Sequence, residues 1–116
     1  MNDEIAELKI AIEKFAKDRD WGQFHTPKNL SMGLAAEAAE VLEIFQWLTA
    51  AQSERLPKAK VADLADELAD TYIYLLKLAG HYDIDLVAAA HKKIEKNSVK
   101  YPVGKARGSA KKYSEL

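Results

Sequence analysis

The chain has 116 residues, 48% hydrophobic and 30% charged, which is typical of one folded domain and excludes a disordered protein. The absence of cysteine excludes disulfides, thiolate metal sites and cysteine nucleophiles. The net charge is −1, but the charges are unevenly distributed. Residues 1–91 contain 9 basic and 16 acidic side chains, whereas residues 92–116 contain 8 basic and 2 acidic ones. The basic C-terminal part indicates either a solvated tail or a region that binds a phosphate chain.

The first half of the chain predicts two helices. Apolar residues recur at helical spacing over residues 3–18, where we expect the first helix. A polar connection leads to Thr26, a suitable N-cap, and Pro27, a suitable first helical residue. The second helix is therefore expected over about 27–49, with a loop around 52–58.

The second half predicts two more helices and a tail. The third helix is expected over about 60–81, and the fourth from Asp83 or Asp85 to about residue 100, where Tyr101 and Pro102 stop it. Without strand-like alternation, the pattern predicts an all-α, four-helix bundle-like protomer. We expect one domain over 1–116, with core helices at about 3–100, an extended basic tail over 101–116 and oligomerisation through the helices.

The second predicted helix has an acidic residue within its apolar face. Positions 30, 34, 37, 41, 44 and 48 share this face, and all are apolar except Glu37. An unpaired carboxylate in a core is costly, so it must be protonated, paired or bound to a cation. Glu40 follows on the same side of the helix.

The third predicted helix repeats this arrangement. Glu67, Asp70 and Tyr74 follow one another at helical spacing beside an apolar stripe, which comprises Val61, Leu64, Leu68, Tyr72 and Leu75. Antiparallel packing would bring the acidic pairs of both helices together. Four oxygen ligands without His or Cys favour Mg²⁺ or Mn²⁺ over a di-iron site, which usually needs Glu-x-x-His. Solvated acidic faces remain the alternative.

The carboxylate spacing resembles a family signature. Glu37-x-x-Glu40, then 26 residues, then Glu67-x-x-Asp70 resembles the pattern of the MazG-like all-α nucleoside triphosphate pyrophosphohydrolases. RDWGQFHTPKNL (19–30), KIEKNSVKYP (93–102) and GSAKKYSEL (108–116) are similar to its dCTP pyrophosphatase branch. The likeness extends from about residue 10 to the end. One departure is Ile12, where vertebrate-type members carry a His near the base pocket.

This resemblance implies an enzyme that hydrolyses a nucleoside triphosphate to the monophosphate and pyrophosphate. It implies dCTP or modified pyrimidine deoxynucleotides as substrates, nucleotide-pool house-cleaning as the role, and a homodimer or homotetramer. Mg²⁺ is the implied cofactor, with Mn²⁺ as a substitute. The implied metal ligands are Glu37, Glu40, Glu67 and Asp70, and either Glu37 or Glu40 would act catalytically by activating the attacking water.

The resemblance also implies substrate contacts beyond the carboxylates. These are Trp21, His25 and Trp47 at the base, Tyr74 and Tyr101 in the cleft, Lys93 and Asn97 at phosphate and sugar, and Arg107, Lys111 and Lys112 in a phosphate-binding tail. Without the resemblance, the same residues would be core aromatics, a turn cap and solvated cations.

The alternative interpretation is a non-catalytic helical interaction module whose basic tail binds an acidic partner. A module has no need for Glu37 within an apolar face, which favours the enzyme. The acidic N-terminus is not a signal peptide and no apolar run is long enough to span a membrane, so we expect a cytoplasmic protein. Without a groove-binding motif, we expect no nucleic acid polymer as partner.

Overall fold

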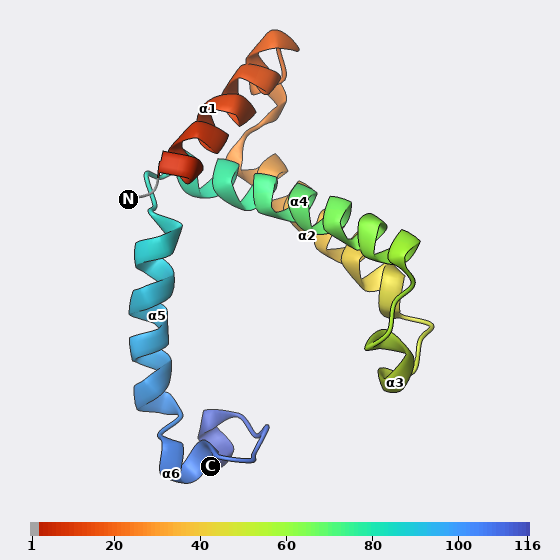
Figure 1. Ribbon diagram of the computed structural model, residues 1–116. Helices are drawn as coiled ribbons and strands as arrows, with labels where there is room; N and C mark the ends of the chain where they lie inside the picture. The colour runs from red at the N-terminus through yellow and green to blue at the C-terminus, as the bar shows by residue number, and fades with distance from the viewer. Residues whose placement is uncertain (1–2) are drawn as a thin grey trace. The chain divides into compact units, whose positions relative to one another are not determined.

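Every regular element in the computed structural model is a helix, and the structure describes residues 3–116 (Figure 1). The predicted all-α fold is therefore confirmed. The elements are α1 (Asp3–Asp18), η1 (Gly22–Phe24), α2 (Pro27–Phe45), α3 (Ala50–Ser53), α4 (Lys58–His81), α5 (Leu86–Lys100), α6 (Val103–Ala106) and η2 (Tyr113–Glu115). No helix within the described residues is long and apolar enough to cross a membrane.

The four long helices expected from the sequence, α1, α2, α4 and α5, are all present. The chain forms two compact units, the first ending at Asp83 and the second beginning at Ile84. The single domain over 1–116, and the closure of all four helices into one bundle, therefore stay predictions.

Helix α2 begins as predicted but ends earlier. The Thr26 hydroxyl accepts a hydrogen bond from the Asn29 backbone at 3.2 Å, which confirms the N-cap. The helix stops at Phe45 rather than near residue 49. Thr49 has extended backbone angles and forms a capping box with Gln52, so it begins the short helix α3 instead of ending α2. The predicted loop around 52–58 is correspondingly shorter.

Helix α4 packs along α2, and the two lie side by side in Figure 1. It begins at Lys58, two residues before the expected start, with Pro57 as N-cap. Gly33 near the start of α2 lies against Tyr74 in the last third of α4. The two helices are therefore antiparallel, as predicted. In this orientation the middle part of α2 lies beside the middle part of α4.

The acidic residues and the apolar stripe of α4 lie on different faces of the helix. Glu67 and Tyr74 are half-buried on the side towards α2. Most of the predicted apolar stripe is exposed instead, with Val61 and Leu68 each 50% exposed and Tyr72 40% exposed. Since the carboxylates lie at the α2 contact, the apolar stripe turns away from it, and most of its side chains remain partly exposed.

The second unit corrects the expectation for the C-terminal tail. Asp85, rather than Asp83, caps α5, accepting a hydrogen bond from the Ala88 backbone at 3.1 Å. Residues 101–116 are not an extended tail, because α6 and η2 form within them. The Tyr113 ring lies 6.1 Å from that of Tyr101, edge to face, so the end of the chain folds back onto the end of α5.

Candidate active site

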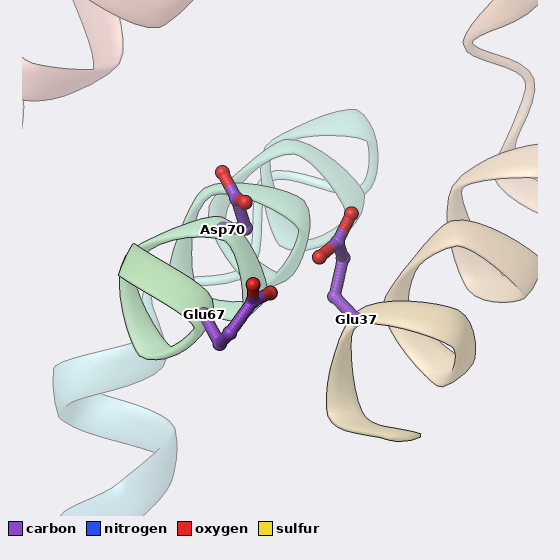
Figure 2. A group of neighbouring side chains, drawn as sticks. All are labelled: Glu37, Glu67 and Asp70. Atoms are coloured by element: carbon purple, nitrogen blue, oxygen red, sulfur yellow. The ribbon is translucent and has the colours of Figure 1, made fainter. Parts of the chain in front are cut away.

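Three carboxylates meet between α2 and α4 (Figure 2). Glu37 comes from α2, whereas Glu67 and Asp70 come from successive turns of α4. One oxygen atom from each lies within 4.8 Å of the others. Like charges this close repel one another, and a shared cation relieves this repulsion.

Two of these carboxylates have an oxygen atom without a hydrogen bond. Oε2 of Glu37 and Oε2 of Glu67 are buried, and neither finds a donor within the described part of the chain. A buried acceptor without a partner is costly. The all-oxygen set therefore fits a divalent cation, and hard cations such as Mg²⁺ prefer these ligands.

The pKa values reflect the crowding of the acidic groups. A hydrogen bond to Glu40, burial and the negative charges of its neighbours raise the pKa of Glu67 to about 7. Burial and then the hydrogen bond with Glu40 raise the pKa of Glu37 as well. Hydrogen bonds from Glu67 and Glu37 lower the pKa of Glu40. Without a cation, the cluster therefore retains a proton near neutral pH.

Glu40 lies at the edge of the cluster. It is exposed and is not one of the three carboxylates that share the 4.8 Å group. Glu40 and Glu67 nevertheless line one shared cavity, and both Glu67 and Glu37 influence the pKa of Glu40, which places it beside them. The structure thus brings all four sequence-predicted acidic residues together, three in the group and one at its rim.

The raised pKa of Glu67 predicts a pH-dependent stability for the metal-free protein. A carboxyl whose pKa rises from 4.5 to about 7 on folding stabilises the folded state fully below pH 4.5 and loses this contribution as pH rises through about 7. We expect the Tm in EDTA to fall between pH 5.5 and 8 by more in the wild type than in Glu67→Gln. His25 is present in both proteins, so the difference between the two curves reports the acidic cluster around Glu67, including the effect of Glu67 on its neighbour Glu37. Parallel curves would contradict the prediction.

A cavity of about 540 Å³ adjoins the cluster. Glu37 and Asp70 line one part of it, and aromatic side chains line much of the rest. The Trp21 ring lies edge to face with His25 at 6.3 Å between ring centres. The remaining lining residues are Ala11, Ile12, Phe15, Ala16, Ile73, Tyr74 and Lys77. Such a mixture of aromatic walls and a few charged groups is typical of a small-molecule site.

Gly33 allows Tyr74 to reach this cavity. A Cβ atom at position 33 would lie 2.8 Å from Cζ of Tyr74, closer than carbon atoms can approach. The ring therefore lies directly against the α2 backbone. A glycine in the middle of a helix lowers helix stability, and the close packing of Tyr74 offsets this loss.

Comparison with known proteins gives the family. A model of the MazG-like family matches residues 34–116. The chain is 42% identical over 114 residues to dCTP pyrophosphatase 1 of Mus musculus, covering 97% of this chain and 67% of the mouse protein. It is 42% identical over 115 residues to the Homo sapiens protein of that name, with the same coverage. The chain belongs to the MazG-like family.

A solved structure supports the same relationship. The crystal structure of a pyrophosphatase from Archaeoglobus fulgidus DSM 4304 superposes with a TM-score of 0.80 at 37% identity. The match covers 85% of this MazG-like chain and 93% of the archaeal one. The fold of this MazG-like chain is therefore similar to that of a solved pyrophosphatase.

Of the remaining residues predicted for the MazG-like site, one lies in the first unit but outside the cavity. Trp47 is in the turn after α2, 87% exposed, and does not line it. The others belong to the second unit, namely Lys93 and Asn97 on α5, Tyr101 at its C-cap, and Arg107, Lys111 and Lys112 around α6 and η2. The roles of these residues stay predictions.

Sequence reasoning missed several residues that line the MazG-like cavity, and two of them have large side chains with specific contacts. Phe15 lines it and packs edge to face on Trp21 at 5.6 Å. Lys77 lines it too, although a lysine near a helix end is usually solvated. The available signal was spacing, because Lys77 follows Asp70 by seven residues and therefore lies on the same side of α4.

Proposed function

We propose that this protein is a Mg²⁺-dependent nucleoside triphosphate pyrophosphohydrolase that acts on dCTP or modified pyrimidine deoxynucleotides. The central observation is the three-carboxylate group, with two unpartnered buried oxygens, beside an aromatic cavity. The identity to dCTP pyrophosphatase 1 over 97% of the chain supports the substrate class. Removal of such nucleotides from the cytoplasmic pool is the corresponding role.

The metal would be held by Glu37, Glu67 and Asp70, with Glu40 completing the set. When bound, Mg²⁺ would offset the charge of the triphosphate and stabilise the negative charge that develops as pyrophosphate leaves. The two unpartnered oxygens on Glu37 and Glu67 support this assignment, since each lacks a cation or donor to satisfy it.

Glu40 is the better candidate for orienting the attacking water. Its pKa is lowered by hydrogen bonds from Glu67 and Glu37, whereas that of Glu37 is raised. An ionised carboxylate can accept a proton, and Glu40 is exposed at the rim, where water can reach it. Glu37 faces inwards and is better placed to bind the metal.

These two roles predict different effects for substitutions at Glu40 and Glu37. Glu40→Gln should still show a rise in Tm with Mg²⁺, because Glu37, Glu67 and Asp70 still hold the metal. It should nevertheless lower kcat by about 100-fold or more, the usual range for a lost general base. Glu37→Gln should lose both activity and the Mg²⁺-dependent rise in Tm. Thermal melts with and without Mg²⁺, beside steady-state kinetics, distinguish them. If Glu40→Gln loses Mg²⁺ binding and Glu37→Gln keeps it, the roles are reversed.

The nucleoside would occupy the aromatic cavity. Trp21 and His25 would contact the base, and Tyr74 would lie between the base and the metal ligands. We further propose that Lys93, Asn97 and Tyr101 bind the phosphate and sugar. Arg107, Lys111 and Lys112 in the tail would also bind the phosphate chain. The concentration of basic residues beyond residue 91 supports this assignment.

A homodimer or homotetramer is also proposed. Val61, Leu68 and Tyr72 leave an apolar stripe of α4 partly exposed, which favours burial against another chain. The exposed Trp47 would then be available to the cavity of a second copy. Its assignment to the base pocket is retained on that basis.

Product analysis on a panel of nucleoside triphosphates tests the proposal. With Mg²⁺, we expect a monophosphate and pyrophosphate, formed fastest from dCTP or a 5-substituted analogue. The same products with another preferred base would keep the reaction and reject the substrate. No turnover with Mg²⁺ or Mn²⁺ would favour a non-catalytic interaction module.

A further inference from the structure

Lys77 is an unusually buried cation. Its side chain is 9% exposed, whereas lysine side chains are normally solvated. It lies on α4 beyond Asp70 and Tyr74, at the i+7 and i+3 positions, and so continues the helix face that carries the metal ligands. The proposed reaction gives this ammonium no role.

The ammonium of Lys77 is only partly satisfied. Its Nζ lies 3.3 Å from Oε1 of Glu13 on α1, whose own side chain is 72% exposed. An ammonium has three N–H donors, and Glu13 is the acceptor that the described residues provide. Two donors therefore remain for a ligand.

These donors lie where two cavities adjoin. Lys77 lines the 540 Å³ cavity beside the carboxylates and a second one of about 530 Å³, and Ile12 and His25 also line both. Nδ1 of His25 is buried without a hydrogen-bond partner in the part of the chain that is described. Burial, and then the positive charge of Lys77, lower the pKa of His25, which places the two side chains near each other.

The position of Lys77 indicates which part of a nucleotide it meets. At 1.5 Å per residue, it lies about 10 Å along α4 from Asp70, with Tyr74 between them. If the phosphates bind at the carboxylates, as the proposed function states, their negative charge lies two helical turns away. The group of the substrate that reaches Lys77 is then the base.

We propose that Lys77 is a specificity-determining residue that donates a hydrogen bond to a carbonyl oxygen of the base. An ammonium is a donor only, so it suits cytosine, uracil, thymine or guanine, each with a carbonyl oxygen. Adenine has no carbonyl and presents an amino group, so it would leave the buried charge without a strong acceptor. Glu13, whose side chain is exposed, pairs with the ammonium and leaves its remaining donors free for the base. This inference rests on the proposed function for the placement of the phosphates.

Binding of uncleavable nucleotides tests the proposal without requiring turnover. Calorimetry with Mg²⁺ would compare α,β-methylene-dCTP with α,β-methylene-dATP on the wild type and on Lys77→Met, which keeps the length of the side chain. We expect the Kd of the cytosine analogue to rise roughly 10- to 100-fold, the range for a lost charge-assisted hydrogen bond. The Kd of the adenine analogue should not rise, because adenine loses no such hydrogen bond.

Glu13→Gln is the matched control, because it removes the ion pair and keeps the ammonium. It should retain most of the preference for cytosine, whereas a purely structural Lys77 would make Glu13→Gln and Lys77→Met alike in both Tm and binding. If Lys77→Met does not fold, Lys77→Leu, which also has no donor, provides the same comparison. Equal weakening of both analogues, or no change in either, would overturn the proposal.

Different outcomes reject the role of Lys77 and the proposed hydrolysis. Loss of base preference in Lys77→Met without hydrolysis of dCTP by the wild type would support Lys77 and reject the proposed reaction. Hydrolysis of dCTP with an unchanged base preference in Lys77→Met would reject Lys77 alone.

Discussion

Glu67→Gln should abolish hydrolysis and, without metal, raise the Tm at pH 8. The activity falls because a neutral amide is a poor ligand for Mg²⁺, and loss of the metal's stabilisation of the transition state lowers kcat by about a thousandfold or more. Stability rises because Glu67, with its pKa of about 7, is ionised at pH 8 and repels the carboxylates of Glu37, Glu40 and Asp70. Steady-state kinetics and thermal melts in EDTA measure the two effects.

Asp66→Asn is the matched control for this variant. Asp66 precedes Glu67 on α4, is exposed and lies outside the three-carboxylate group. The same loss of one negative charge should leave kcat and Tm close to the wild-type values. If Glu67→Gln retains full turnover, Glu67 is not a metal ligand, and equal effects of both substitutions would indicate a general charge effect.

Mg²⁺ should stabilise the protein before any substrate is present. A cation among Glu37, Glu67 and Asp70 relieves their repulsion and satisfies the two unpartnered oxygens. At ten times its Kd, Mg²⁺ contributes about 1.4 kcal/mol by mass action. For a domain of this size, that gain raises the Tm by roughly 5 °C or more. EDTA should reverse the rise and stop hydrolysis.

The cation effect must be specific to the cluster. Asp70→Asn should show little rise in Tm at the same Mg²⁺ concentration, and Na⁺ at matched ionic strength should not replace Mg²⁺ in the wild type. An unchanged wild-type Tm at millimolar Mg²⁺ would count against the metal site. A rise of the same size in Asp70→Asn would place the bound cation elsewhere.

The long helices were predictable because their signals are local. Thr26 followed by Pro27 marks the start of α2 in any tertiary context. The end of α2 was predicted wrongly because Leu48 continues the apolar spacing beyond Phe45. The signal that decides this boundary is the reciprocal pairing of Thr49 with Gln52, which begins a new helix.

The acidic cluster was predictable for a different reason. Glu37 interrupts an apolar face, and only pairing, protonation or a cation can compensate for a buried carboxylate. Lys77 was not predictable in this way, because its burial depends on α1 packing against α4, which places Glu13 beside it. The C-terminal tail was also misjudged, since the Tyr101–Tyr113 contact joins residues with no periodic relationship.

The central claim is that the carboxylate cluster, with Mg²⁺, cleaves a nucleoside triphosphate between its α and β phosphates. Phosphorus NMR of dCTP incubated with the wild-type protein, first in EDTA and then with excess Mg²⁺, tests it directly. We predict no change in EDTA and conversion to dCMP and pyrophosphate after Mg²⁺ is added, with no conversion by Glu67→Gln. Appearance of dCDP and orthophosphate, or equal turnover in EDTA, would contradict it.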